Sequence, residues 1–182
     1  MSTQVTAGIL EEDGFVTFHR LRKWAAEHSL QDFEGSYPAH ALMLGLSDEL
    51  RNSGAGGRSS EAGMLTLNQS SLDYLKYVAK VGFLTKRPGL PFPRIISLGR
   101  TTSNDVVIDV RSVSKLHGHF ETRDGDWSFS DNDSTSGSWL NGTRLEPKRG
   151  YPLKSGDTLR FGPDMEAVFL TPAALYARTR TA

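Results

Sequence analysis

One arginine, one lysine and several hydroxyl side chains stand in turn-rich segments of the second half of the sequence. Arg100 follows Gly99 where an apolar run ends, and Ser114, Lys115 and Thr135 lie in polar stretches between other apolar runs. A doubly charged phosphate ester requires fixed hydrogen-bond donors and positive charge. Arginine offers a planar fork of N–H groups, hydroxyls donate from short side chains, and lysine adds a mobile charge. If these turns converge at one end of a strand-built scaffold, such residues could bind an anion there; taken singly, each of them also fits an ordinary surface arginine or lysine or a turn-stabilising hydroxyl.

The segments that must position these side chains alternate between short apolar runs and turns. From Pro93 onward, turn sequences such as RDGD, NDSTSG and KSGD separate runs rich in Val, Ile, Phe and Trp. Short strands at close spacing, joined by Gly, Asn and Asp turns, are typical of an all-β sandwich or barrel. The expected fold is mainly β, an antiparallel β-sandwich with an α-helical N-terminal extension. Strands are expected at residues 95–98, 106–110, 117–122, 127–129, 138–140, 158–161 and 167–170.

The N-terminal part of the chain has helical rather than strand periodicity. An amphipathic helix is expected between Phe15 and Leu30, because side chains that could pack together recur there at intervals of three and four residues. A second helix is expected from Pro38 to Leu50, since proline suits a first helical turn and several leucines follow it. The positions at helical spacing in the first helix are Phe18, Leu21, Trp24, Ala25 and His28.

A Gly- and Ser-rich stretch, residues 52–63, separates the two halves and indicates a flexible linker. After it, residues 72–79 favour a short helix that begins with a capping box at Ser70 and Asp73, while a strand through residues 80–84 competes with it. The first strand of the sandwich comes from residues 81–84, from residues 64–67, or is missing. The expected division is a helical extension (1–51), the linker (52–63), a helix or strand connector (64–92), the sandwich (93–171) and a C-terminal tail forming a frayed helix (172–182).

Composition argues against several classes of function. The 182 residues contain 21 Lys plus Arg and 21 Asp plus Glu, so no net charge favours a nucleic-acid partner. Without cysteine there is no disulfide, thiol nucleophile or thiolate metal site. No signal peptide is apparent and no apolar run approaches the ~18 residues of a membrane span, so a cytoplasmic protein without a membrane partner is expected. Because the usual catalytic motifs are absent, neither enzyme activity nor a cofactor or metal is expected.

Several short motifs follow one another in a fixed order across the β-rich half. None of them is specific alone, but their order and spacing resemble the forkhead-associated (FHA) domain family over roughly residues 93–171. The motifs are Gly99-Arg100, Asn104-Asp105, SVSKLH at 112–117, STSGSWLNG at 134–142, and Gly156-Asp157 before the strand that ends at Phe161-Gly162.

The resemblance implies that Arg100 and Ser114 contact a phosphate, that Thr135 lies in the same pocket, and that phosphothreonine is preferred over phosphoserine. Many relatives have an Asn that holds the backbone of the bound peptide where this chain has Ser136, which is shorter and has fewer donors. The expected phosphopeptide-binding residues are Arg100, Ser114, Lys115, Thr135 and Ser136. Structural support is expected from Gly99, His117, Asn141 and Gly142, with His117 fixing the binding loop through hydrogen bonds.

The implied function is a phosphothreonine-dependent protein interaction module in Ser/Thr kinase signalling. Its partner would be a phosphothreonine protein, either a Ser/Thr kinase or the substrate of one. An alternative stays open, in which the helical N-terminal half acts as a phosphorylation-independent scaffold or oligomerises. A further hypothesis is self-association through the chain's own phosphorylated threonines, because some lie in polar or terminal segments: Thr3, Thr6, Thr17 and Thr179.

Overall fold

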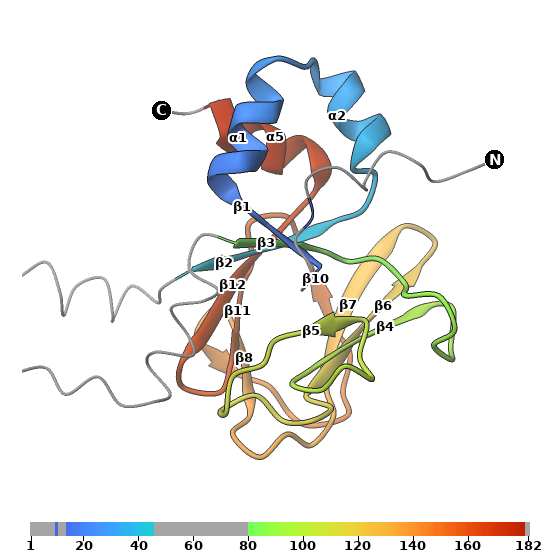
Figure 1. Ribbon diagram of the computed structural model, residues 1–182. Helices are drawn as coiled ribbons and strands as arrows, with labels where there is room; N and C mark the ends of the chain where they lie inside the picture. The colour runs from blue at the N-terminus through green and yellow to red at the C-terminus, as the bar shows by residue number, and fades with distance from the viewer. Residues whose placement is uncertain (1–9, 11–13, 46–79, 181–182) are drawn as a thin grey trace, which may run out of the picture.

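Two β-sheets packed face to face form the centre of the described part of the protein (Figure 1). The computed structural model describes residue 10 and residues 14–45 and 80–180. One sheet has the order β1 (Phe15–Thr17), β3 (Lys80–Phe83), β2 (Ala41–Gly45), β12 (Met165–Leu170), β11 (Thr158–Phe161), β8 (Ser138–Leu140), β9 (Thr143–Arg144). The other has the order β10 (Tyr151–Leu153), β7 (Asp126–Asp131), β6 (Gly118–Arg123), β4 (Ile95–Gly99), β5 (Val106–Val107). Among the strands of the described residues, only β4 and β5 pair in parallel, so the expected fold class is confirmed.

The core between the sheets is built from side chains at alternate strand positions. Phe120 and Phe129 stand opposite each other on β6 and β7, and Phe161 and Phe169 face them from the other sheet; all four are almost fully buried. Successive strand residues point to opposite faces, so one face of each strand enters this core. Burying a phenylalanine side chain contributes about 1.5–3 kcal/mol relative to leaving it exposed. The core therefore fixes the sheets on which the loops at the sandwich ends are carried.

The first predicted helix divides into three elements. Residues 15–17 form β1, followed by α1 (Phe18–Ala26) and then α2 (Leu30–Ser36). Thr17 caps α1 by accepting a hydrogen bond from the backbone N–H of Arg20, and Ser29 and Asp32 form a capping box at α2. A cap of this kind satisfies backbone donors that the first helical turn leaves open. The helical spacing thus holds within α1, but the single long helix is wrong.

The second predicted helix is wrong where the structure describes it. Ala41–Gly45 form β2, which pairs with β3 on one side and with β12 on the other. Leucine, alanine and methionine favour helices in isolation, but pairing with two strands overrides this weak preference. β3 confirms the strand alternative for residues 80–84. The predicted linker at 52–63, the helix over 72–79, the alternative strand at 64–67 and the rest of the second helix lie outside the described residues.

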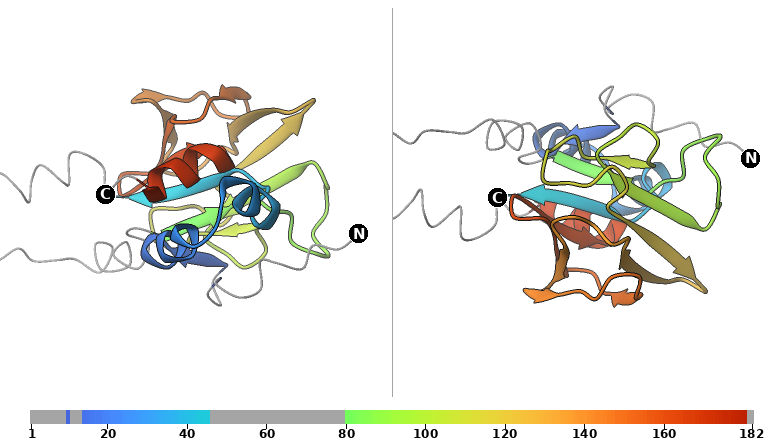
Figure 2. Two further views of the ribbon diagram at one scale, coloured as in Figure 1. Left: turned by 90° about the horizontal axis from the view of Figure 1, so that it is seen from above. Right: turned by 90° about the horizontal axis from the view of Figure 1, so that it is seen from below.

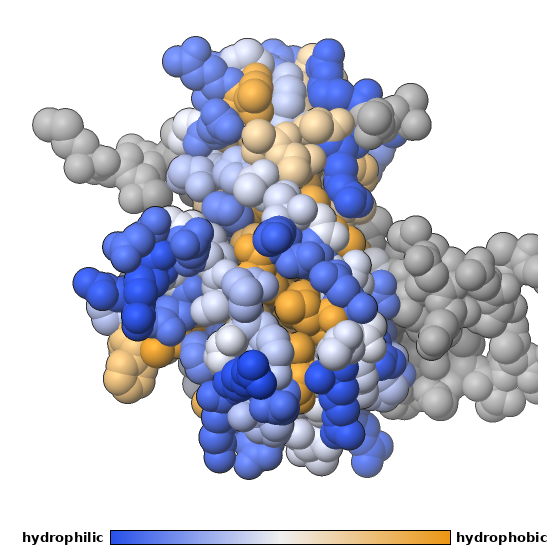
Figure 3. All heavy atoms as spheres, turned by 180° about the vertical axis from the view of Figure 1, so that it is seen from behind, coloured by the Kyte–Doolittle hydropathy of each residue, from blue (hydrophilic) through white to orange (hydrophobic). Residues whose placement is uncertain are grey.

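Three helices cover the outer face of the β1–β3–β2 part of the larger sheet, as the view from above shows (Figure 2). The third, α5 (Pro172–Arg180), packs against α1 and α2 and buries Leu175 between them. The Tyr176 hydroxyl donates a 2.8 Å hydrogen bond to the carbonyl oxygen of His28. The tail is helical as expected, but it is packed rather than frayed. On the side turned away in Figure 1, an apolar strip bordered by hydrophilic residues runs through the middle of the protein (Figure 3).

The end of the sandwich away from the helices carries three loops, which lie in the lower part of Figure 1. Residues 100–105 join β4 to β5, residues 108–117 join β5 to β6, and residues 132–137 join β7 to β8. We call these three loops the rim. Loops carried by a rigid scaffold are the usual place for binding residues.

Candidate functional site

Arg100 is anchored to the neighbouring rim loop by two hydrogen bonds. Its backbone N–H donates to the carbonyl oxygen of Ser114 at 2.9 Å, and its Nε donates to the carbonyl oxygen of Val113 at 3.1 Å. Among the described residues, the two terminal amino groups of its guanidinium have no hydrogen-bond or ion-pair partner. The side chain is therefore held in place with the donors at its far end left for a ligand.

Ser114 and Thr135 meet across two rim loops. The backbone N–H of Thr135 donates to the Ser114 hydroxyl oxygen at 3.0 Å, and the two hydroxyl oxygens lie 3.4 Å apart. Ser114 and Ser136 are half-buried, while the side chains of Thr135 and Lys115 are exposed. Fixed hydroxyls beside an oriented guanidinium are the donors that an anion requires. The structure thus gathers the five expected binding residues along the rim.

The loop that carries Arg100 is locked to the Lys115 segment by the side chain of Asn104, which belongs to the Asn104-Asp105 motif. Asn104 is buried, and its Nδ2 donates to the carbonyl oxygens of Lys115 at 2.7 Å and Thr101 at 2.9 Å. A Cβ atom at Gly99 would lie 2.3 Å from that same Lys115 oxygen. Only glycine therefore permits this close approach of the two loops. This is the way in which Gly99 can support the site.

His117 lies in the interior beneath the rim and connects two of its loops. Its Nδ1 accepts a 3.1 Å hydrogen bond from the backbone N–H of Ser114, so Nε2 carries the ring proton and donates to the Ser138 hydroxyl at 3.1 Å. That hydroxyl donates in turn to a carboxylate oxygen of Asp131 at 2.5 Å. The expected role of His117 as a support of the binding loop agrees with this geometry.

Asp131 holds the third rim loop in shape. Besides Ser138, it accepts hydrogen bonds from the backbone N–H of Ser134 at 2.8 Å and from its hydroxyl at 2.7 Å. Burial alone would raise the pKa of Asp131, but the hydrogen bonds from Ser138 and Ser134 outweigh it and lower the pKa below its ordinary value. The carboxylate therefore stays charged while it fixes the segment that leads to Thr135. Sequence spacing alone could not reveal this role in a run of turn-forming residues.

Burial makes His117 a source of pH-dependent stability. The pKa of His117 lies below its ordinary value because burial disfavours the charged ring, although the nearby Asp131 carboxylate opposes this. The unfolded chain takes up a proton near pH 6.5 that the folded protein does not accept until lower pH. The free energy of unfolding should therefore fall as the pH drops below about 6.5.

His117→Asn tests this origin, because asparagine keeps an acceptor for the Ser114 N–H and does not titrate. Urea unfolding from pH 7.5 to pH 5 should give a smaller loss of stability in the variant than in the wild type. A residual slope is expected from His40, whose pKa burial also lowers. Identical slopes in the two proteins would show that His117 is not the group responsible.

A second buried carboxylate holds the other end of the Arg100 loop. Asp105 accepts hydrogen bonds of 2.9 Å from the Lys86 ammonium, the Arg87 backbone, and both the backbone and hydroxyl of Ser97. Burial raises the pKa of Asp105, but these hydrogen bonds together lower it below its ordinary value. The Arg100 loop is thus tied at residue 104 to the neighbouring loop and at residue 105 to the sheet.

Asn141 and Gly142 do not lie on the rim. They form the turn between β8 and β9, at the end of β8 opposite the 132–137 loop, with φ angles of 49° and 80°. Asn141 bonds to the Asp157 carboxylate and to the backbone N–H of Thr158, each at 2.9 Å. These two residues therefore connect the β8–β9 turn to β11, and any support they give to the site passes through β8.

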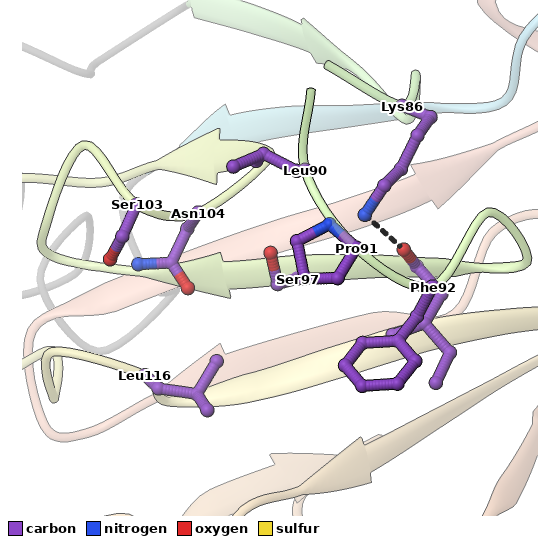
Figure 4. A pocket seen from close by; sticks show the side chains of 9 residues that line it. Lys86, Leu90, Pro91, Phe92, Ser97, Ser103, Asn104 and Leu116 are labelled. Atoms are coloured by element: carbon purple, nitrogen blue, oxygen red, sulfur yellow. Dashed lines mark hydrogen bonds between the residues drawn. The ribbon is translucent and has the colours of Figure 1, made fainter. Parts of the chain in front are cut away.

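A pocket of about 200 Å³ lies beside the Arg100 loop (Figure 4). Leu90, Pro91, Phe92 and Leu116 give it an apolar lining, while Lys86, on its wall, donates to the carbonyl oxygen of Ile95. The side chains of Phe92 and Leu116 are 67% and 49% exposed. The rim is therefore bordered on this side by a mainly apolar pocket, whose lysine already donates hydrogen bonds to protein groups.

Residues 96–162 match the family model of the FHA domain. This segment is an FHA domain. Its limits enclose all three rim loops and, with them, Arg100, Ser114 and Thr135. The FHA segment does not include β1, β2, β3 or β12, which complete the larger sheet. The fold described above therefore extends beyond the matched segment on both sides.

The curated relatives share a short part of the FHA segment. The chain is 44% identical over 43 residues to the human E3 ubiquitin-protein ligase RNF8, covering 24% of this chain and 9% of the ligase. It is 39% identical over 64 residues to the E3 ubiquitin-protein ligase DMA2 of Saccharomyces cerevisiae, covering 32% of this chain and 12% of the ligase. The chain thus spans about a tenth of the length of these relatives.

Solved structures with a similar arrangement include FHA domains bound to peptides. The N-terminal FHA domain of Saccharomyces cerevisiae Rad53p, solved with a phosphothreonine peptide, is 20% identical, with a TM-score of 0.44 and coverage of 73% of this chain and 93% of that domain. An FHA domain of an Arabidopsis thaliana hypothetical protein is 22% identical, with a TM-score of 0.43 and coverage of 63% of this chain and 94% of that domain.

Within the described ranges, none of the helices beside the FHA segment has the length and apolar character needed to cross a membrane.

Proposed function

We propose that this protein docks a partner by binding a phosphorylated threonine at the rim. The observation that carries the proposal is the state of Arg100, which is anchored through its backbone and Nε while its terminal amino groups have no partner among the described residues. The joined Ser114 and Thr135 lie beside it in an FHA domain, a family that reads phosphorylated motifs. We expect a dissociation constant near micromolar, or about −8 kcal/mol, because the ligand is a short exposed segment.

The finer parts of this function follow from the same chemistry. We propose phosphothreonine rather than phosphoserine as the ligand, because a small apolar niche for one methyl group can supply about 1–3 kcal/mol of selectivity. A partner phosphorylated on threonine implies a Ser/Thr kinase pathway, in which the partner is the kinase or its substrate. We place this docking in the cytoplasm. We also propose that the FHA segment works together with the N-terminal part of the chain, since β2 and β3 belong to its larger sheet.

An oriented peptide library tests the proposal directly. The full chain is screened against three matched sets of peptides with a central phosphothreonine, phosphoserine or unmodified threonine. Binding should be strongest for phosphothreonine and should weaken as salt rises, because the phosphate contacts are partly exposed. Equal binding of modified and unmodified peptides would refute phosphate recognition and favour a phosphorylation-independent scaffold.

Ser136→Asn should strengthen peptide binding. The asparagine side chain offers an amide donor and acceptor that serine lacks, at the half-buried position next to Thr135. One added hydrogen bond to the peptide backbone contributes about 0.5–1.5 kcal/mol, or about two- to tenfold in affinity. Calorimetric titration with one phosphothreonine peptide measures the change, and Ser155→Asn, at an exposed position outside the rim, is the control. A loss of affinity in Ser136→Asn would show that this position does not face the peptide.

The surroundings of the chain's own threonines reduce the number of them that could be phosphorylated and so serve self-association. Thr179 is only 3% exposed and its hydroxyl donates to the carbonyl oxygen of Tyr176 at 2.6 Å, so the expectation that a kinase reaches it in the folded protein is wrong. Thr17 caps α1. Thr3 and Thr6 lie outside the described residues. We therefore propose a separate partner protein as the main ligand.

A further inference from the structure

Two arginines flank one tryptophan on the outer face of the larger sheet, next to the rim. The register places Trp139 on β8 between Arg160 on β11 and Arg144 on β9. The guanidinium carbons of Arg160 and Arg144 lie 3.9 and 5.6 Å from the centroid of the Trp139 ring. Both distances are within the range of cation–π attraction. We call these three residues the arginine–tryptophan row.

Cation–π attraction to the ring holds the two guanidinium groups near it without using their N–H donors. A guanidinium that contacts an aromatic ring through its face keeps its N–H groups, which lie in its own plane. Among the described residues, neither Arg144 nor Arg160 has a hydrogen bond or an ion pair. Glu166 is the cross-strand neighbour of Arg160 on the side away from Trp139, and it takes part in an interaction of its own. Two arginine side chains held beside one ring thus present donors that no group in the described ranges satisfies.

The row adjoins the phosphate-facing loop. A Cβ atom at Gly137 would lie 3.2 Å from the Nε of Arg144, so this guanidinium rests against the end of the 132–137 loop. Trp139 comes four residues after Thr135 in the sequence. Four residues span at most about 14 Å, which is also the reach of about four residues of an extended peptide. A peptide held at Thr135 can therefore reach the row with a residue no more than about four positions from its phosphothreonine.

We propose that the arginine–tryptophan row is a second anion subsite, which binds an acidic side chain of the same phosphopeptide. The inference rests on the proposed function and names its preferred ligand class: phosphothreonine peptides with a carboxylate or a second phosphate within about four residues of the phosphothreonine. Planar arginines suit either group, because both present oxygen acceptors that a guanidinium fork can contact. The row discriminates among phosphopeptides, while Arg100 provides the phosphate dependence common to all of them.

A glutamate walk measures this subsite. A neutral phosphothreonine peptide is the reference, and single glutamates replace its residues from four positions before to four positions after the phosphothreonine. At the best position, wild-type affinity in fluorescence anisotropy should rise by about three- to tenfold, the range of a partly exposed, geometrically fixed ion pair. The gain should vanish in Arg144→Ala and Arg160→Ala, whose affinity for the reference peptide stays within about twofold of wild type. Phosphoserine at the best position distinguishes a phosphate from a carboxylate.

Arg22→Ala is the matched control, because it removes one exposed arginine from α1, far from the rim, and should keep the full glutamate gain. The subsite is refuted if no glutamate position raises affinity, or if the gain persists unchanged in both variants. If the reference peptide binds and its binding requires Arg100, either of these results refutes the second subsite alone. If no phosphothreonine peptide binds the wild type, the proposed function fails and the subsite falls with it.

Discussion

Arg100→Ala should lower the affinity for a phosphothreonine peptide by roughly 2–5 kcal/mol, or about thirty- to several-thousand-fold. The variant removes the guanidinium whose position is set by the carbonyl oxygen of Val113 and by the backbone bond to Ser114. Without it, a doubly charged phosphate at the rim loses its planar donor and is left without its main counter-charge. Calorimetric titration of wild type and variant with one peptide gives the difference directly.

Two controls separate geometry from charge in this experiment. Arg100→Lys keeps the positive charge but loses the planar fork and the Nε bond to Val113, so it should recover only part of the affinity. Arg123→Ala removes an arginine that is 78% exposed at the far end of β6, and its affinity should match the wild type. Affinity that Arg100→Ala leaves unchanged would mean that the rim is not the phosphate site.

Gly99→Ala should reduce both stability and peptide binding. The added methyl group would meet the Lys115 carbonyl oxygen at 2.3 Å and the Asn104 amide at 2.8 Å. That oxygen cannot move freely, since it accepts hydrogen bonds from Asn104 and from the hydroxyl of Thr101. Forcing extra atoms into a packed site costs about 1–3 kcal/mol in the free energy of unfolding. Because the clash separates the loops that carry Arg100 and Lys115, phosphopeptide affinity should fall as well.

Gly35→Ala provides a matched glycine control for this pair of measurements. Gly35 lies in α2, and a Cβ atom there would meet nothing within 4 Å. Alanine in a helix should therefore raise the free energy of unfolding by about 0.4–1 kcal/mol and leave binding unchanged. Urea denaturation and peptide titration of both variants provide the comparison. Equal stability of Gly99→Ala and Gly35→Ala would contradict the close approach at the rim.

Local pattern predicted much of the sandwich but not the strands defined by distant partners. β4, β6, β7, β8, β11 and β12 lie where alternating apolar runs and turn residues indicated strands. β2 was expected to be helical, because its alanine, leucine and methionine suit a helix and only pairing with β12 and β3 selects a strand. β10 contains Pro152, and proline is tolerated in this strand because β10 lies at the edge of its sheet.

For the candidate site, sequence order pointed to the rim but not to the groups that hold it. Arg100, Ser114 and Thr135 could be selected because the order of short motifs resembles the FHA domain family, whose phosphate-contacting residues the resemblance places at these positions. Asn104 appeared only as part of a motif and Asp131 was not selected, since their hydrogen bonds to other loops leave no trace in local spacing. Asn141 and Gly142 matched a motif but lie at the other end of β8. Whether the selected side chains bind phosphate stays a prediction for the peptide experiments.

The pairing of β2 with β12 has a consequence for the order in which the protein acquires its structure. Ala41–Gly45 adjoin Met165–Leu170, strands separated by most of the chain. During synthesis the first of these segments leaves the ribosome long before its neighbour exists, at rates of about 5–20 residues per second. The larger sheet cannot close until Met165–Leu170 has emerged. Until then, the edge of Ala41–Gly45 that pairs with this segment stays without its partner strand.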